Sequence, residues 1–218
     1  VTIAFDLNRG ARTNKEPYVP DDLLKAIVDQ CDILFITHEH SDHADWNIAS
    51  LFVNKRKNVI VPDRFWENRS EFIRHKRSEE MISESIKLAN GLDLQVKVMP
   101  GYQDNIPNNV YIITTPEGLC IAHTGDQSTK RDDEWINHVK EHSSVDVLLV
   151  HCWAIPLERM INGFNPRLVI TGHENEMTHS VDHRESYWLN YRRMEKVPQP
   201  KLFMTWGENF LYNRDNVD

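Results

Sequence analysis

Short apolar runs alternate with helical patterns along the whole chain, and this alternation predicts an α/β fold rather than an all-α or all-β one. The expected strands are Thr2–Leu7, Ile33–Thr37, Asn58–Val61, Leu92–Met99, Val110–Thr114, Leu119–His123, Val145–Val150, Leu168–Thr171, Lys201–Thr205 and Phe210–Tyr212. The Pro-Glu-Gly turn at 116–118 joins two of these strands as a hairpin. Part of the sheet is therefore expected to be antiparallel.

Apolar residues at helical spacing fill several segments between the strands. One helix is expected to begin at Pro20-Asp21-Asp22, with its apolar face formed by Leu23, Leu24, Ile27 and Val28. Further helices are expected at Asp45–Asn54, Ser78–Ala89, Arg131–His142 and Ser180–Lys196. Neither an internal repeat nor a linker interrupts this order, so the sequence predicts one domain over residues 1–218.

Composition agrees with a globular protein. The chain has 218 residues, of which 40% are hydrophobic, enough for one sizeable α/β domain. No run approaches the ~20 apolar residues that a membrane-spanning helix needs, so no membrane partner is expected. No secretory signal precedes the first strand, and Val1 is not an initiator Met, which suggests a processed or trimmed chain.

Net charge and the positions of the cysteines indicate which partners and which cell compartment to expect. A net charge of −8 disfavours an extended nucleic-acid surface. The basic stretch Arg69–Arg77 is the exception, and we interpret it as one solvated helix face, with a phosphate-binding patch as the alternative. Cys31, Cys120 and Cys152 lie in or beside apolar runs, so buried reduced thiols and a cytoplasmic location are expected.

The densest group of chemically active residues follows the apolar run Ile33–Ile36. His38-Glu39-His40-Ser41-Asp42-His43 holds three histidines and two carboxylates within six residues. Neutral imidazoles and carboxylates are ligands that borderline divalent metals accept readily. A short loop after a buried strand can direct several of them into one cavity. This pattern predicts a metal site, and the alternative is a solvated polar loop.

The pattern His-x-His-x-Asp-His at 38–43 resembles the signature of the metallo-β-lactamase superfamily. The resemblance implies an αββα sandwich, here without the opening hairpin before Val1. It also implies that His38 and His40 bind one metal, while Asp42 and His43 bind a second. Among the branches of the superfamily, the lactonase-like, ascorbate-6-phosphate-hydrolysing one is the most similar, because His123 precedes the Gly125-Asp126 pair.

Two further ligands follow from the same resemblance. Asp126, in the Gly-Asp pair after the strand ending at His123, matches the carboxylate that bridges the two metals. His173, after the strand Leu168–Thr171, matches the histidine that completes the second site. A carboxylate suits the bridging role because each of its oxygens can reach one cation.

The third motif of the family is where the sequence departs. The family has a histidine in a Pro-Gly-His context, and here Pro100-Gly101 is followed by Tyr102, whose neutral phenol is a poor zinc ligand. Three outcomes are open. The centre can be mononuclear, the protein can have lost catalysis, or another residue can substitute. The candidate substitutes are His123, His151 and Asp104.

The implied activity is hydrolysis of a small ester, lactone or phosphoester by a metal-bound hydroxide. The expected cofactor is one or two zinc ions, with manganese or iron as alternatives. Asp42 is expected to orient the attacking water, and Tyr102 to donate a proton to the developing oxyanion. The other interpretations are a phosphodiesterase or nuclease, a non-catalytic binding module, and a di-iron redox protein. The expected partner is a small-molecule substrate; nucleic acid is not expected, and a homo-oligomer is left open.

Overall fold

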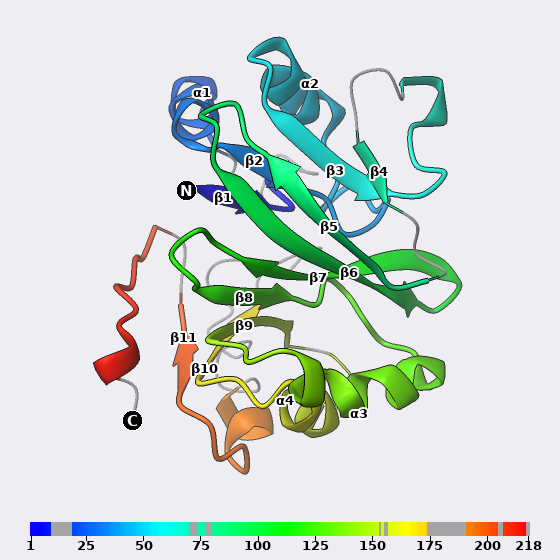
Figure 1. The fold of residues 1–218 in the computed structure, drawn as a ribbon, viewed down its shortest axis with the longest axis vertical. Coiled ribbons are helices and arrows are strands. Elements are labelled where there is room, and N and C mark those ends of the chain that lie inside the picture. Colours follow the sequence, from blue (N-terminus) through cyan, green and yellow to red (C-terminus); the bar gives the residue numbers. More distant parts are fainter. Residues whose placement is uncertain are drawn as a thin grey trace.

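Four layers make up the fold: a pair of helices, two sheets packed face to face, and a second pair of helices (Figure 1). The computed structural model describes residues 1–9, 19–69, 74–76, 80–152, 154, 157–173, 191–204 and 207–216. The outer layers are α1 (Asp21–Gln30) with α2 (Trp46–Asn54), and α3 (Asp133–His142) with α4 (Leu157–Phe164). This is the αββα arrangement that the family resemblance implies.

The first sheet has four strands, all parallel, in the order β1-β2-β3-β4. Their bounds are Ile3–Phe5, Ile33–Phe35, Asn58–Pro62 and Arg74–Lys76. Helices α1 and α2 are the crossovers between the first three strands, as parallel pairing requires. The carboxyl ends of β1 and β2 therefore meet at one edge, where the loop that follows β2 begins.

The second sheet has seven strands in the order β11-β10-β9-β8-β7-β6-β5. Their bounds, from β5 to β11, are Ile82–Lys87, Asp93–Gln103, Ile106–Thr114, Cys120–His123, Val147–His151, Leu168–Gly172 and Lys201–Phe203. Strands β5 to β8 pair antiparallel, and β8 to β11 pair parallel. The predicted hairpin at 116–118 is confirmed, since it joins β7 to β8.

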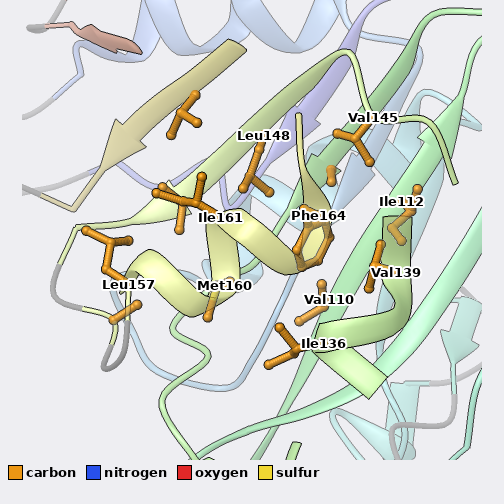
Figure 2. Packing of buried hydrophobic residues seen from close by; sticks show 14 of the residues in the cluster. Val110, Ile112, Ile136, Val139, Val145, Leu148, Leu157, Met160, Ile161 and Phe164 are labelled. Atoms are coloured by element: carbon orange, nitrogen blue, oxygen red, sulfur yellow. The ribbon is translucent and has the colours of Figure 1, made fainter. Parts of the chain in front are cut away.

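Alternate residues of the inner strands feed different core layers. Ile33 and Phe35 of β2 pack between the sheets, whereas Leu34 and Ile36 pack under α1 and α2. Burial on both faces explains why β2 is an uninterrupted apolar run. Figure 2 shows a further hydrophobic cluster, between the second sheet and the helices α3 and α4. In this cluster, Phe164 of α4 lies among side chains of α3 and of the second sheet. The fully buried side chains each contribute roughly 1.5–3 kcal/mol.

The structure corrects three expectations. The segment Ser78–Ala89 contains the strand β5 (Ile82–Lys87) rather than a helix, because Ile82 and Ile86 fit a period of two as well as one of four. No strand forms at Phe210–Tyr212, where Leu211 is 90% exposed. The Arg69–Arg77 stretch is not one helix face, since it contains β4.

Elsewhere in the chain, the structure agrees with the expectations in part. Of the expected helix Ser180–Lys196, residues 191–194 are helical and the part before residue 191 lies outside the described residues. Helix α4 was not predicted. Short 3-10 helices occur at Glu67–Arg69, Lys130–Asp132 and Arg214–Asn216. All three cysteines are free and buried, as expected. Among the described residues, no helix has the length and apolarity to cross a membrane. The single domain over residues 1–218 stays a prediction.

Candidate metal centre

Side chains from both sheets converge on the carboxylate of Asp126, which follows β8 and is 2% exposed. Its Oδ1 lies 3.4 Å from Nε2 of His43 and 4.0 Å from Nε2 of His151. Its Oδ2 lies 3.2 Å from Nε2 of His173 and 3.7 Å from Nε2 of His38. Each carboxylate oxygen thus lies beside two imidazoles, so Asp126 is at the centre of the cluster.

The remaining predicted ligands join the same cluster. Asp42 Oδ2 lies 3.5 Å from Nε2 of His43 and 3.7 Å from Nε2 of His173. His40 Nδ1 lies 3.1 Å from Nε2 of His38. The structure therefore brings together all six residues that the sequence nominated as metal ligands, and it adds His151, one of the candidate substitutes.

Backbone geometry at Gly125 fixes the position of Asp126. Gly125 has a φ of +53°, and a Cβ there would lie 2.2 Å from Oδ1 of Asn108 and 2.7 Å from Cβ of Thr37. Asn108 accepts the backbone N–H of Asp126 at 3.0 Å and donates to the carbonyl of Thr124 at 2.9 Å. Only glycine fits this close approach, so the Gly-Asp pair is a steric requirement of the loop as well as a motif.

Asp6, at the end of β1, was not singled out by the sequence. Its Oδ2 accepts a hydrogen bond from Nδ1 of His43 at 2.8 Å, and its Oδ1 accepts the backbone N–H of Thr37 at 2.7 Å. The Thr37 hydroxyl donates to Oδ2 of the same carboxylate at 2.7 Å. A carboxylate on Nδ1 directs Nε2 of the ring into the cluster, as partners of metal-binding histidines do. The available signal was a carboxylate ending an apolar strand.

Burial and charge set the protonation states. Burial, helped by the neighbouring His43, lowers the pKa of His38 to about 4. Burial also lowers the pKa of His151 to about 4. Burial alone would lower the pKa of His43, but Asp6 and Asp126 raise it to about 11. For Asp126, His173 and His43 outweigh burial and hold the pKa of the carboxyl well below its usual range.

The other sequence candidates lie in different settings. His123 Nδ1 accepts the backbone N–H of Gly125 at 3.0 Å, and its ring stacks on Phe5 with centroids 4.7 Å apart. Through this hydrogen bond, His123 supports the loop that carries Asp126. Asp104 lies in the exposed turn between β6 and β7. Tyr102 is partly buried on β6, and its backbone N–H donates to Oε1 of Gln127 at 2.7 Å.

The donor set fits a divalent metal. Three groups have ligand atoms that lie within 4.8 Å of one another: His38 with His43 and Asp126, Asp42 with His43 and His173, and Asp126 with His151 and His173. Nε2 of His43 is buried and has no hydrogen-bond partner among the described residues. Imidazole and carboxylate ligands suit zinc, iron and manganese, so the chemistry admits each of these metals.

One family model covers most of this chain. The family described as "Beta-lactamase superfamily domain" matches residues 3–173, which include every residue of the cluster. A search of curated protein sequences finds no significant match.

Several solved structures share the fold. Igni18, a metallo hydrolase from the archaeon Ignicoccus hospitalis, superposes with a TM-score of 0.65 at 18% identity, over 97% of this chain and 91% of that one. An isothiocyanate hydrolase from Delia radicum gut bacteria gives 0.58 at 12% identity, over 96% of this chain and 87% of that one. CmlA, a diiron beta-hydroxylase from Streptomyces venezuelae, gives 0.58 at 13% identity, over 81% of this chain and 44% of that one. Identities this low show the fold alone.

Proposed function

Since the chain belongs to the beta-lactamase superfamily and has its αββα fold, we propose that it is a metal-dependent hydrolase of a small ester, lactone or phosphoester. The observation that carries the proposal is the convergence of histidines and carboxylates on Asp126. The His123-Thr-Gly-Asp126 segment, which resembles the lactonase-like branch, supports a small substrate. The net charge of −8 supports the same choice over a nucleic acid.

In this proposal, two sets of residues share Asp126. His38, His40 and Asp126 would hold one ion, and we call them the first half of the centre. Asp42, His43, Asp126 and His173 would hold the other and form its second half. His151 lies beside the second half, with Nε2 4.0 Å from Oδ1 of Asp126. Zinc is the first candidate, with manganese and iron as alternatives. A bound divalent cation would polarise a carbonyl or phosphoryl oxygen and lower the pKa of a water toward roughly 7.

The chain's own residues have distinct tasks around that chemistry. Asp42 Oδ2 stands beside His43 and His173, where it can accept a hydrogen bond from the attacking water and orient it. Asp6 holds the His43 ring in one orientation through Nδ1. Burial of His38, His43 and Asp126 excludes bulk water, so the charges of the centre act in a medium of low dielectric constant.

Tyr102 is the proposed proton donor to the oxygen that gains charge. Tyr102→Phe removes only the phenol oxygen, so turnover should fall by roughly 100-fold or more, as for a lost general acid, while the metal content stays unchanged. Unchanged turnover would remove Tyr102 from the mechanism without affecting the rest of the proposal.

The decisive test combines elemental analysis with a substrate panel. The protein is stripped, reloaded separately with zinc, manganese or iron, and assayed on aryl esters, lactones and phosphodiesters. We expect metal-dependent hydrolysis of at least one class. Asp126→Asn should lower the rate of hydrolysis by more than roughly 100-fold. Removing a residue that only hydrogen-bonds to a metal ligand already costs roughly 10–100-fold, and the loss of a ligand should cost more. Asp104→Asn, in the exposed turn, is the matched control.

The outcomes discriminate between the alternatives. A protein that takes up no metal is a non-catalytic module, and one that binds metal without hydrolysing any substrate class also refutes the hydrolase. Tight, selective iron binding together with reduction and reoxidation would favour the redox interpretation. Hydrolysis of phosphodiesters alone would favour the phosphodiesterase or nuclease.

A further inference from the structure

We infer that Gln103, the residue after Tyr102, takes the place of the missing third-motif histidine and completes the first half of the centre with its side-chain amide. This inference rests on the proposed metal-dependent function. It assigns a metal-site role to a residue type that the histidine and carboxylate pattern of the sequence does not reveal.

The first support is a direct contact. Nε2 of Gln103 donates a hydrogen bond to Oδ2 of Asp126 at 3.0 Å. The same Oδ2 lies 3.7 Å from Nε2 of His38, which in turn lies 3.1 Å from Nδ1 of His40. The amide of Gln103 is therefore joined to the carboxylate that the first half of the centre uses.

The second support is the other end of the amide. Oε1 of Gln103 is buried and has no hydrogen-bond partner among the described residues. A buried carbonyl oxygen without a partner is rare and carries a free-energy cost, since it has lost its hydrogen bonds to water. A cation beside it removes this cost, because an amide oxygen is a neutral ligand that divalent metals accept.

The third support is the direction of the strand faces. Successive side chains of a strand project from opposite faces, so Gly101 and Gln103 share a face of β6. Tyr102 lies on the other face, which Val96 and Val98 turn toward the first sheet and which is the side from which the His38–His43 loop comes. A Cβ on Gly101 would lie 2.2 Å from Oε1 of Gln127, in the loop that carries Asp126. The face that Gly101 and Gln103 share is thus the face turned toward the Asp126 loop.

Replacing an imidazole by an amide has a chemical consequence. Imidazole suits zinc, iron and nickel, whereas carbonyl oxygens suit manganese and magnesium. The first half of the centre, with an oxygen where the family has a nitrogen, should therefore hold zinc more weakly than a three-histidine site does. It should discriminate less between zinc and manganese.

The experiment measures metal binding rather than activity. Wild type, Gln103→Ala, Gln103→His and Tyr102→Phe are titrated with zinc and with manganese against a chelating dye, and the cobalt-substituted proteins are compared by visible absorption. Gln95→Ala is the matched control, since Gln95 lies on the same strand and donates to Ser85 on an exposed surface. Thermal melts of the metal-free proteins check that each variant folds.

We expect Gln103→Ala to weaken the more loosely held ion by roughly 10–100-fold and to change the cobalt spectrum. Gln103→His should bind zinc more tightly than wild type and raise the zinc-to-manganese preference. Tyr102→Phe and Gln95→Ala should bind both ions as wild type does.

The inference is overturned if Gln103→Ala binds both metals like wild type, or if Gln103→His does not tighten zinc. It is also overturned if Tyr102→Phe alone loses the ion. These results would not affect the proposed hydrolase function, because they concern only the role of Gln103. A wild-type protein that binds metal but hydrolyses nothing refutes the hydrolase, and the metal titrations still decide the role of Gln103. A wild-type protein without metal affinity overturns both.

Discussion

Asp6 and His43 lie 37 residues apart in the sequence, and Oδ2 of Asp6 accepts the Nδ1 proton of His43 at 2.8 Å. The pair joins the end of β1 to the loop after β2, and Thr37 donates its backbone N–H and its hydroxyl to the same carboxylate. The ring is thereby held with Nε2 toward Asp126. The orientation of a predicted ligand depends on a residue outside every motif.

Asp6→Asn should weaken metal binding by roughly 10–100-fold. The neutral amide lacks the negative charge with which Oδ2 of Asp6 accepts hydrogen bonds from His43 and from the Thr37 hydroxyl, so the His43 ring is held less firmly. The measurement is a competition titration against a chelating dye. Asp22→Asn, at an exposed position of α1, is the control for the loss of one negative charge. Equal metal affinity in the wild type and Asp6→Asn would show that Asp6 serves the loop alone.

Gly125→Ala should destabilise the fold and disturb the centre together. The residue has a φ of +53°, and the added Cβ would press on Asn108 and Thr37. Gly118→Ala is the matched control, since its φ is +82° but nothing lies within 4 Å of the added carbon. Urea unfolding should show a loss of roughly 1–2 kcal/mol for Gly118→Ala, from backbone strain alone. Gly125→Ala should lose clearly more; equal losses would contradict the crowding.

Removing the metal should lower the thermal midpoint of the wild type. A ligand that binds only the folded state stabilises it by about 2.7 kcal/mol at a free concentration 100 times its Kd. Scanning calorimetry with and without a chelator measures the difference, and Asp126→Asn should show little of it. A chelator that leaves the wild-type midpoint unchanged would mean that the cluster binds no metal under those conditions.

Acid should weaken the attachment of the C-terminal segment. Asp146, before β9, accepts hydrogen bonds from Nε of Arg214 at 2.7 Å and from the backbone N–H of Cys120 at 2.8 Å. Burial opposes ionisation, but Arg214 and the Cys120 N–H outweigh it and lower the pKa of Asp146 below its usual value. The stabilisation is thus present above the unfolded-state pKa of roughly 4 and is lost as the pH falls through the lower folded-state value.

Asp146→Asn isolates this contribution. Urea midpoints of wild type and variant should differ at pH 7 and approach each other as the pH is lowered toward 3. Asp93→Asn, at an exposed position of β6, controls for a general effect of charge. A gap between Asp146→Asn and wild type that stays constant with pH would assign the effect to packing rather than ionisation.

The sequence predicted the candidate ligands that lie close together in the chain, and it missed the residues that only strand pairing and sheet packing bring to the site. The loop His38–His43 is recognisable because its ligands are neighbours in the chain, and the strand ends before Asp126 and His173 are marked by apolar runs. Asp6 and Gln103 carry no such mark. The roles that we propose for them depend on the pairing of β1 with β2 and on the face of β6 that meets the Asp126 loop.

The errors in secondary structure have the same origin. Ile82 and Ile86 are four residues apart, which fits a helix, and only the pairing of β5 with β6 decides for a strand. Helix α4 was missed because it is short, although Met160, Ile161 and Phe164 bury one side of it. Gly163, inside α4, has no room for a Cβ against the carbonyl of Ile136. Tertiary packing overrides local propensity at each of these places.

The division of the ligands between the two sheets has a consequence for the order of folding. His38 and His43 follow a strand of the first sheet, whereas Asp126 and His173 follow strands of the second. Neither of the two proposed ligand sets comes from one sheet alone. On this proposal, a cation would meet a complete ligand set only after the two sheets have docked, and once bound it would slow their separation. We therefore expect metal uptake to come late in the assembly of this protein and metal release to be an early sign of its opening.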